Sequence, residues 1–352
     1  MKKSLMPAVA ALAVALLTGF KTATVVPQDG GNPVQAMVRR LELGRPVSHG
    51  NLTIVPVYLN RVLDRTRYAT LEDALKNGWI TITEVEGGRV PQVKISNLSK
   101  QLIFLMGGEI LTGCRQDRIL AGDILLAPGT RDLLAPVFCV EQGRWTHISQ
   151  NFFSKQNLGT PALRARAQEK SPAAQSQIWG KIAEENEVMG VSSSTGAYQD
   201  AYEKDENRAR IMKIEEKMSG IPRLHADTVG VVVGLGGEVV SADIFTNPDL
   251  FLKQWPKILK SSALSSLGSA KGGALDRNAA AGFLESFMGR KYRSQAGLDL
   301  GLEYSAIDSA ANIQALVYND ATLHLAGFPQ DEDRLKVIRD DRGDPMPAVR
   351  LR

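Results

Sequence analysis

The sequence has few of the residues from which metal sites and disulfide scaffolds are built. It contains two cysteines and four histidines in 352 residues. The histidines are scattered without metal-ligand spacing, so no metal site is predicted. Cys114 and Cys139 could form a disulfide in an exported protein. The sequence leaves their geometry open, and two buried free thiols are the alternative.

The standard catalytic and cofactor-binding motifs are missing as well. There is no P-loop, no Gly-x-Ser-x-Gly elbow and no His-Glu-x-x-His pair. Residues 234–237 are rich in glycine, but they lead into a strand pattern and offer no helix N-terminus to a pyrophosphate. A two-residue hairpin turn at Gly236 and Gly237 is the better interpretation. No cofactor is predicted.

Long apolar runs are scarce, and the one at the N-terminus has the features of an export signal. Lys2 and Lys3 precede an apolar run at residues 5–17, which is typical of a secretory signal and too short for a transmembrane helix. We therefore expect residues 1–23 to export the protein to the periplasm or the exterior. An uncleaved membrane anchor and a helix packed on the domain are the alternatives.

The chain has no dense basic patch with interleaved aromatic residues, so no nucleic-acid partner is expected. Removing residues 1–23 takes away three lysines and lowers Lys+Arg from 42 to 39, against 38 acidic residues. The basic isoelectric point of about 9.0 is therefore partly a property of the export segment.

The remaining chain predicts an α+β fold in which an N-terminal and a C-terminal part share one compound core. Residues 24–50 are rich in glycine, proline and polar residues and predict a linker. Short apolar runs separated by Gly or Pro turns predict an antiparallel β-rich part over 51–150. One short helix is expected at 71–76. A single family domain over 51–328 is the predicted organisation.

Helices are expected to dominate residues 151–222, where polar and charged residues recur at helical spacing. Ser171 and Pro172 predict the start of one helix, and a second charged helix is expected over 199–218. Such charged runs are usually solvated faces, so this segment is predicted to be exposed.

The β pattern returns over residues 223–328. A hairpin is expected around Gly236 and Gly237, followed by a helix that begins at Asn247 and Pro248, a second helix and three strands. Residues 329–352 are charged and predict a polar tail.

Two polar clusters interrupt the apolar pattern of the β-rich part. The first contains Glu109, Gln116 and Arg118, and the second contains Glu141, Arg144 and Trp145. Charged groups beside apolar strands are costly to bury unpaired, so they must satisfy one another or meet a ligand.

A ligand site would use these side chains in different ways. Glu109 and Glu141 are the candidate catalytic bases. The candidate ligand-binding residues are Gln116, Arg118, Arg144 and Trp145, because arginine binds carboxylate or phosphate in a bidentate way and tryptophan stacks on flat or sugar rings. A buried Glu–Arg network that fixes the fold is the alternative.

At these clusters the sequence resembles the prokaryotic domain family named for its association with ADP-ribosylglycohydrolases and rhodanese-like phosphatases. The resemblance rests on Gly108-Glu109 followed by Gly113-x-x-Gln116-x-Arg118 and on the run Cys-Val-Glu-Gln-Gly-Arg-Trp at 139–145. It continues through Ala-Asp-Ile-Phe at 242–245, a helix at 250–259 and His-Leu at 324–325. The resemblance implies no defined activity, and its link to ADP-ribose or a nucleotide sugar is by association alone.

Three functions are compatible with these observations. The first is a ligand-binding or accessory domain for a phosphorylated or sugar-containing small molecule. The second is a hydrolase of a phosphorylated or glycosidic substrate. The third is a structural or interaction protein that presents the helices near 173–218 to a partner in the cell envelope. Whether the protein is an enzyme stays open at this point.

Overall fold

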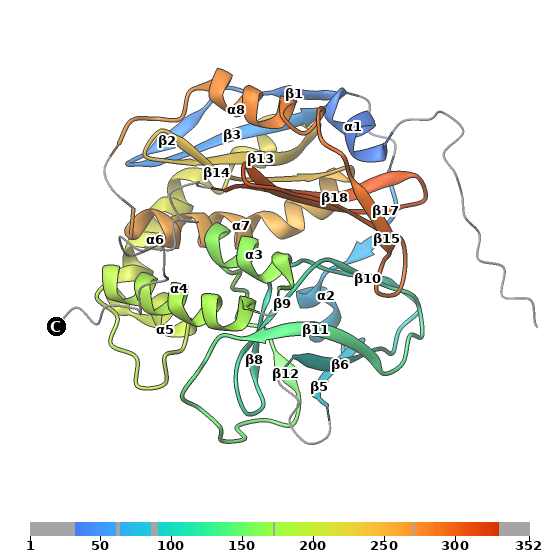
Figure 1. Ribbon diagram of the computed structural model, residues 1–352, viewed down its shortest axis with the longest axis vertical. Helices are drawn as coiled ribbons and strands as arrows, with labels where there is room; N and C mark the ends of the chain where they lie inside the picture. The colour runs from blue at the N-terminus through green and yellow to red at the C-terminus, as the bar shows by residue number, and fades with distance from the viewer. Residues whose placement is uncertain (1–31, 61–63, 86–90, 172, 270–271, 331–352) are drawn as a thin grey trace, which may run out of the picture. The chain divides into compact units, whose positions relative to one another are not determined.

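The computed structural model describes residues 32–60, 64–85, 91–171, 173–269 and 272–330, and their fold belongs to the predicted α+β class (Figure 1). The predicted export segment, residues 1–23, lies outside the described residues. In the described part, no helix combines the length and apolar character needed to cross a bilayer.

A nine-stranded antiparallel sheet, here called the large sheet, is the centre of the fold. Its main path runs β1-β3-β13-β14-β18-β17-β16-β15, and β2 pairs with β3 beside it. Its strands are β1 (Leu41–Leu43), β2 (Val47–His49), β3 (Leu52–Leu59), β13 (Thr228–Leu235), β14 (Glu238–Phe245), β15 (Arg293–Ala296), β16 (Leu302–Ile307), β17 (Ala311–Tyr318) and β18 (Ala321–Pro329). The hairpin predicted at Gly236 and Gly237 joins β13 to β14, and both glycines adopt positive φ.

Helices cover both faces of the large sheet. Figure 1 shows α1 (Pro33–Val38) and α8 (Arg277–Glu285) on one face. The other face is covered by α3 (Pro161–Glu169), α4 (Ala174–Val188), α6 (Asp205–Met218) and α7 (Pro248–Leu267). Each face carries its own apolar core.

The longest of these helices, α7, has the start that the sequence predicts. The side chain of Asn247 accepts a hydrogen bond from the backbone N–H of Leu250, and Pro248 occupies the first turn. Phe251 and Trp255 share the face that packs into the core. Burying each of these aromatic side chains stabilises the fold by roughly 1.5–3 kcal/mol.

The β-rich N-terminal part forms two further sheets around a third apolar core. One contains β4 (Tyr68–Ala69), β7 (Leu102–Leu105) and β10 (Ile124–Leu126); the other contains β5 (Ile80–Glu84), β6 (Gln92–Asn97), β8 (Ile110–Gly113), β9 (Arg118–Leu120), β11 (Leu133–Cys139) and β12 (Phe152–Phe153). The short helix α2 (Leu71–Lys76) occupies the predicted residues. A capping box between Thr70 and Asp73 fixes its first turn.

The structure differs from the sequence prediction in two segments. Residues 33–49 of the predicted linker form α1, β1 and β2, because Val34 and Met37 pack into the apolar core on the α1 and α8 face of the large sheet. The helical middle is not simply exposed, since Ile211 and Ile214 of α6 and Tyr198 are buried in the core.

Two helix boundaries in the middle also differ. The helix expected over 199–218 is split into α5 (Gln199–Glu203) and α6 by Lys204, whose ψ of 121° is not helical. A short 3-10 turn, η1 (Ile221–Arg223), follows α6. The helix α4 begins after Ala173, which makes no side-chain cap bond. The predicted Pro172 of its first turn lies outside the described residues.

Candidate functional site

Residues of the second polar cluster form an ion-paired network with their neighbours at the end of β9 and β11. One nitrogen of Arg144, Nη2, lies 2.5 Å from Oε2 of Glu141 and 3.0 Å from Oδ1 of Asp117. Burial, reinforced by the nearby Glu141 carboxylate, raises the pKa of Asp117 to about 6 against the opposing effect of Arg144. The other oxygen of Glu141 accepts a bond from the hydroxyl of Thr195 at 3.2 Å.

Gln116 and Arg118 extend this network: the amide of Gln116 donates to the carbonyl of Gln142, and Arg118 donates to the carbonyl of Asp117. Nη1 of the buried Arg118 donates to the backbone carbonyl of Gln116 at 3.0 Å, and Nη2 lies 3.9 Å from Oε1 of Glu84. Burial lowers the pKa of Arg118 although acidic neighbours oppose the shift. The structure thus brings Gln116, Arg118, Glu141 and Arg144 together, and they bond to one another, to Asp117 and to backbone carbonyls.

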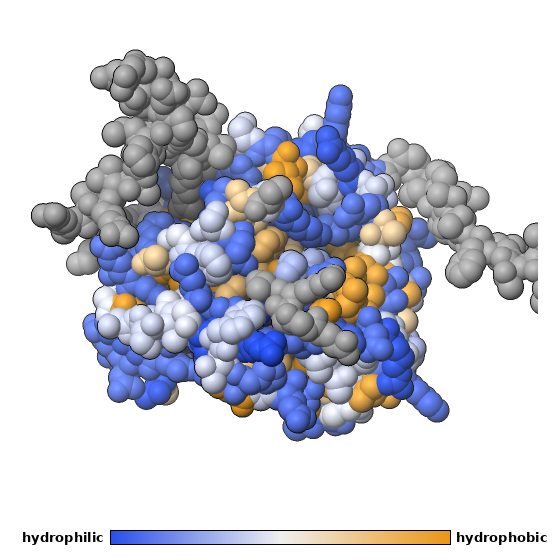
Figure 2. All heavy atoms as spheres, turned by 60° about the horizontal axis from the view of Figure 1, so that its bottom comes forward, coloured by the Kyte–Doolittle hydropathy of each residue, from blue (hydrophilic) through white to orange (hydrophobic). Residues whose placement is uncertain are grey.

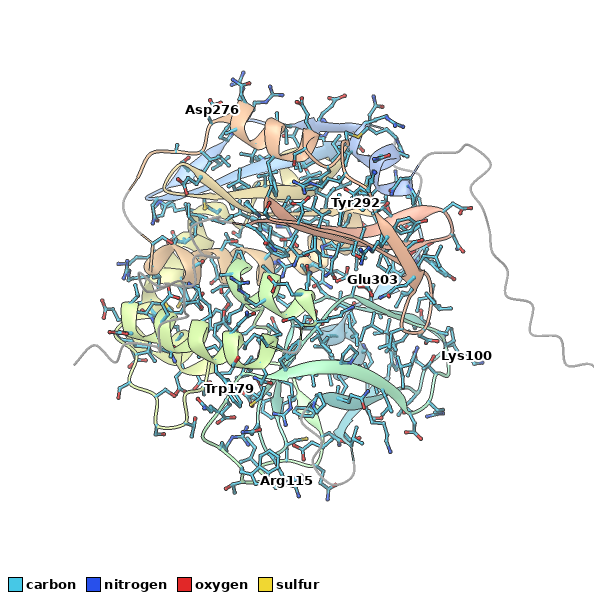
Figure 3. The ribbon with its side chains drawn as sticks, in the orientation of Figure 1. Lys100, Arg115, Trp179, Asp276, Tyr292 and Glu303 are labelled. Atoms are coloured by element: carbon cyan, nitrogen blue, oxygen red, sulfur yellow. The ribbon has the colours of Figure 1, made fainter. Side chains whose placement is uncertain are left out.

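Trp145 lies at the surface beside this network. It is 54% exposed, and the guanidinium carbon of Arg115 lies 5.7 Å from its ring centroid. Figure 3 shows Arg115 at the opposite end of the molecule from Asp276, which precedes α8.

The face shown in Figure 2 is mostly hydrophilic, and outside the grey atoms its apolar patches are small and separate.

Glu109 is placed elsewhere and is completely buried. Its Oε1 forms an ion pair with Lys257 of α7, whose Nζ also lies 2.7 Å from Oε2 of Glu72. Burial raises the pKa of Glu109 to about 7. Burial opposes the charge on Lys257, but the two carboxylates outweigh it and raise the pKa of Lys257. One ammonium between two carboxylates leaves a surplus negative charge, which a proton on Glu109 would remove.

The catalytic roles of Glu109 and Glu141 and the binding roles of Gln116, Arg118, Arg144 and Trp145 stay predictions. What the structure adds is that Glu109 does not share a site with the other five. Cys114 and Cys139 are both buried as free thiols.

A second buried network, which the sequence interpretation missed, joins the N-terminal sheets to the large sheet. Arg164 of α3 binds Asp243 of β14 through two bonds of 2.9 and 2.6 Å. His324 of β18 lies 2.7 Å from Oδ2 of Asp123 and 3.3 Å from Oδ1 of Asp243. The other oxygen of Asp123 accepts the backbone N–H of Gly107 at 2.8 Å.

These contacts fix the charge states of the network. Burial alone would neutralise His324, but Asp123 and Asp243 raise its pKa to about 9. Burial is likewise outweighed at Asp243, where Arg164 and His324 hold the pKa well below its usual range. Two members of this network, Asp243 in the run at 242–245 and His324 in the pair at 324–325, belong to the family resemblance, but no site was predicted there.

The described residues enclose a cavity of about 1180 Å³, here called the α3–α4 groove. Its walls come from α3, α4, the C-terminal end of α7, the β13–β14 hairpin, Phe283 of α8 and the end of β18. Phe283 packs against the apolar core on the face covered by α1 and α8, whereas Leu264 of α7 belongs to the core on the opposite face. The groove therefore reaches both faces, so the sheet is open where it passes.

The large sheet is open here where the pairing between β14 and β18 ends. β14 pairs with β18 only as far as Ala242 and Gly327, although β14 begins at Glu238 and β18 ends at Pro329. The register between β13 and β14 shifts beside Gly234, which leaves Val240 as an extra residue on β14. Such a bulge bends and twists a strand, and this one lies two residues from Ala242, where the pairing of β14 with β18 ends.

Both charged and apolar side chains line the groove. The apolar part includes Val188 and Met189 of α4 and Val239 and Val240 of β14. The charged residues are four glutamates and two basic residues: Glu169, Glu184, Glu185, Glu238, Arg166 and Lys181. The wall contains the ion pairs Arg166–Glu169 and Lys181–Glu184, and the hydroxyl of Thr160 donates to Oε1 of Glu185 at 2.8 Å.

Comparison with known proteins gives one match. The family model described as the ARG and Rhodanese-Phosphatase-superfamily-associated Protein domain covers residues 40–328. No curated protein and no solved structure matches the chain.

Proposed function

The chain belongs to the ARG and Rhodanese-Phosphatase-superfamily-associated Protein domain family, and on this premise we propose that it is an accessory protein that binds an elongated ligand in the α3–α4 groove. The family association supports the accessory role. The observation that carries the binding site is the groove of about 1180 Å³ at the opening of the large sheet. Pockets for compact ligands usually measure about 300–1,000 Å³, so this groove suits a longer molecule.

The polar cluster around Arg144 supports a different role. Arg144 pairs with the carboxylates of Glu141 and Asp117, and Arg118 donates to the backbone carbonyls of Gln116 and Asp117. This pattern favours a network that fixes the loops around β9 and β11. The helix α4, which the sequence offered as part of a partner surface, forms one wall of the groove.

A blocked groove tests the proposal. In the Ala162→Trp variant, an indole on α3 would occupy the groove, whereas in Ala279→Trp the same side chain would lie on an exposed turn of α8. A pool of random octapeptides should be retained by the wild-type protein and by Ala279→Trp, and retention should fall about tenfold or more in Ala162→Trp. Matched melting curves would exclude unfolding as the cause.

Two outcomes would overturn the proposal. One is equal peptide retention by all three proteins. The other is binding of ADP-ribose or a nucleotide sugar that Ala162→Trp does not weaken, together with no retention of peptides. The second outcome would return the search to the cluster around Arg144.

Export belongs to the proposal as well, and it rests on Lys2, Lys3 and the apolar run at 5–17. Fusing residues 1–30 to a reporter enzyme that folds only after disulfide formation should give activity, because disulfides form outside the cytoplasm. Replacing two apolar residues of the run with arginine should abolish it. Reporter activity that does not depend on the run would contradict export by this segment.

A further inference from the structure

A second cavity lies between the C-terminal end of α6 and the middle of α7, two helices that pack against each other (Figure 1). It measures about 140 Å³ and is here called the α6–α7 pocket. A cavity of roughly 150 Å³ can hold a benzene ring, so this pocket suits a group of the size of one large side chain. It shares no lining residue with the α3–α4 groove. Its lining consists of Glu215, Ser219, Arg223, Leu252, Trp255, Pro256 and Leu259.

The apolar wall of the α6–α7 pocket is fixed by contacts in the core. The ring of Trp255 is buried, and its centroid lies 6.0 Å from that of Phe251. Its Nε1 donates to the backbone carbonyl of Ser219 at 3.0 Å, which ties α7 to the end of α6. Leu259 is buried as well, whereas Leu252 is 37% exposed. The wall is therefore in place before a ligand arrives, and an apolar ligand group would cover the exposed part of Leu252.

A carboxylate without a partner lines the same pocket. Glu215 is partly buried, and no described residue forms a hydrogen bond or an ion pair with its side chain. Burial raises the pKa of Glu215, and the positive charge of Lys260 offsets this only in part. The ammonium of Lys260 is engaged elsewhere, since it donates to Oδ1 of Asn157 at 2.5 Å and lies 5.1 Å from the ring centroid of Tyr202. The ammonium of a ligand would give Glu215 the partner that it lacks.

The pocket also contains a basic group and a backbone acceptor. Arg223, the last residue of η1, is exposed, and its guanidinium forms no ion pair with Glu215 or with any other described residue. Pro256 has no N–H, so the carbonyl of Leu252 one turn earlier lacks its usual helical bond. The lining thus offers one charge of each sign, which complements a ligand that carries both.

We propose that the α6–α7 pocket binds a free amino acid with an apolar side chain. The ammonium of the ligand binds the carboxylate of Glu215 and the carbonyl of Leu252, and its carboxylate binds the guanidinium of Arg223. Its side chain packs on Trp255 and Leu259. This site is additional to the proposed ligand site in the α3–α4 groove and does not depend on it.

Isothermal titration calorimetry with the full-length protein tests the three contacts separately. The probes are L-leucine, L-valine and L-phenylalanine, and at least one of them should bind. The tightest of them is then compared with glycine, which lacks the side chain, with its own amide, which lacks the carboxylate, and with its deaminated acid, which lacks the ammonium. Each of these three compounds should bind more weakly by about tenfold or more, because each loses one charged hydrogen-bonding group or the apolar contact.

Two variants connect each charge of the ligand with one residue. Glu215→Gln should weaken binding of the amino acid by about tenfold but should not weaken binding of the deaminated acid. Arg223→Gln should weaken binding of the amino acid but not of its amide. Glu216→Gln and Arg210→Gln are the matched controls at exposed positions of α6 outside the pocket, and they should leave binding unchanged. Melting curves of all four variants check that each is folded.

Several results would overturn this inference. They are no binding of any of the three amino acids, and binding that neither Glu215→Gln nor Arg223→Gln weakens. An amide that binds as tightly as the amino acid would make the ligand a simple amine. Loss of amino-acid binding in Ala162→Trp would place the ligand in the α3–α4 groove, whereas binding that Ala162→Trp leaves intact supports the α6–α7 pocket even if peptide retention fails. The two proposals can therefore fail independently.

Discussion

Replacing Asp243 with asparagine should be among the most damaging single changes in this protein. The carboxylate of Asp243 accepts two bonds from Arg164 and lies 3.3 Å from His324, and all three side chains are buried. Asparagine keeps the shape but removes the charge, so the guanidinium of Arg164 loses its carboxylate partner, and His324 keeps its contact with Asp123. Removing one partner of a buried ion pair costs about 3–5 kcal/mol, and we expect the free energy of unfolding to fall by that amount.

Urea denaturation followed by tryptophan fluorescence measures this loss, and the m-value should not change if the variant still unfolds in two states. Asp205→Asn is the matched control, because Asp205 pairs with Arg208 on the exposed side of α6. That change should cost no more than about 1 kcal/mol. A loss at Asp243 no larger than at Asp205 would refute the reasoning.

A double variant checks the same argument without an orphaned charge. Arg164→Met combined with Asp243→Leu removes both members of the pair. It should cost less than the sum of the two single changes, because neither partner is left unpaired. A fully additive cost would show that Arg164 and Asp243 do not stabilise each other.

Three further predictions concern pH and backbone strain. The folded pKa of His324, about 9, exceeds its ordinary value of 6.5, so its stabilisation is complete below pH 6.5 and is lost as the pH rises through about 9. Wild type should therefore lose more unfolding free energy between pH 7 and 9.5 than His324→Gln, and equal losses would contradict the ion pairs. Burial raises the pKa of Glu109 from 4.5 to about 7, so ionising it in the folded protein costs free energy. Wild type should therefore become less stable relative to Glu109→Gln as the pH rises from 5 to 8, a trend that parallel urea titrations of both proteins would show or refute. Gly108→Ala should lower the free energy of unfolding by about 1–3 kcal/mol, because φ is +95° and the added Cβ would lie 2.4 Å from Cγ of Arg164. Thermal melts should show this loss, whereas the control Gly220→Ala, which has open space around the added Cβ, should be nearly neutral.

Local features of the fold were predictable because they depend on neighbouring residues. The hairpin at Gly236 and Gly237, the capped start of α7 and the short helix at 71–76 follow from turn chemistry, capping and periodicity. The linker prediction for 24–50 failed over residues 33–49. Its short apolar segments are stabilised by packing on the large sheet, which a local pattern does not reveal.

The candidate site was predictable only in part for the same reason. Gln116, Arg118, Glu141 and Arg144 lie close together because β9 and β11 pair, with Cys139 opposite Arg118. Glu109 belongs to the same motif in sequence, but its side chain points to Lys257 of α7, which is 148 residues away along the chain.

By itself, the sequence determined the α+β class, the family and the presence of charged groups beside apolar strands. Only the tertiary structure decided how those charges pair, because Arg164, Asp243 and His324 come from three separate elements. It also decided where the α3–α4 groove, the proposed ligand site, lies. The α3–α4 groove lies where the pairing of β14 with β18 ends at Ala242 and Gly327, and a local sequence pattern does not reveal where strands 85 residues apart stop pairing.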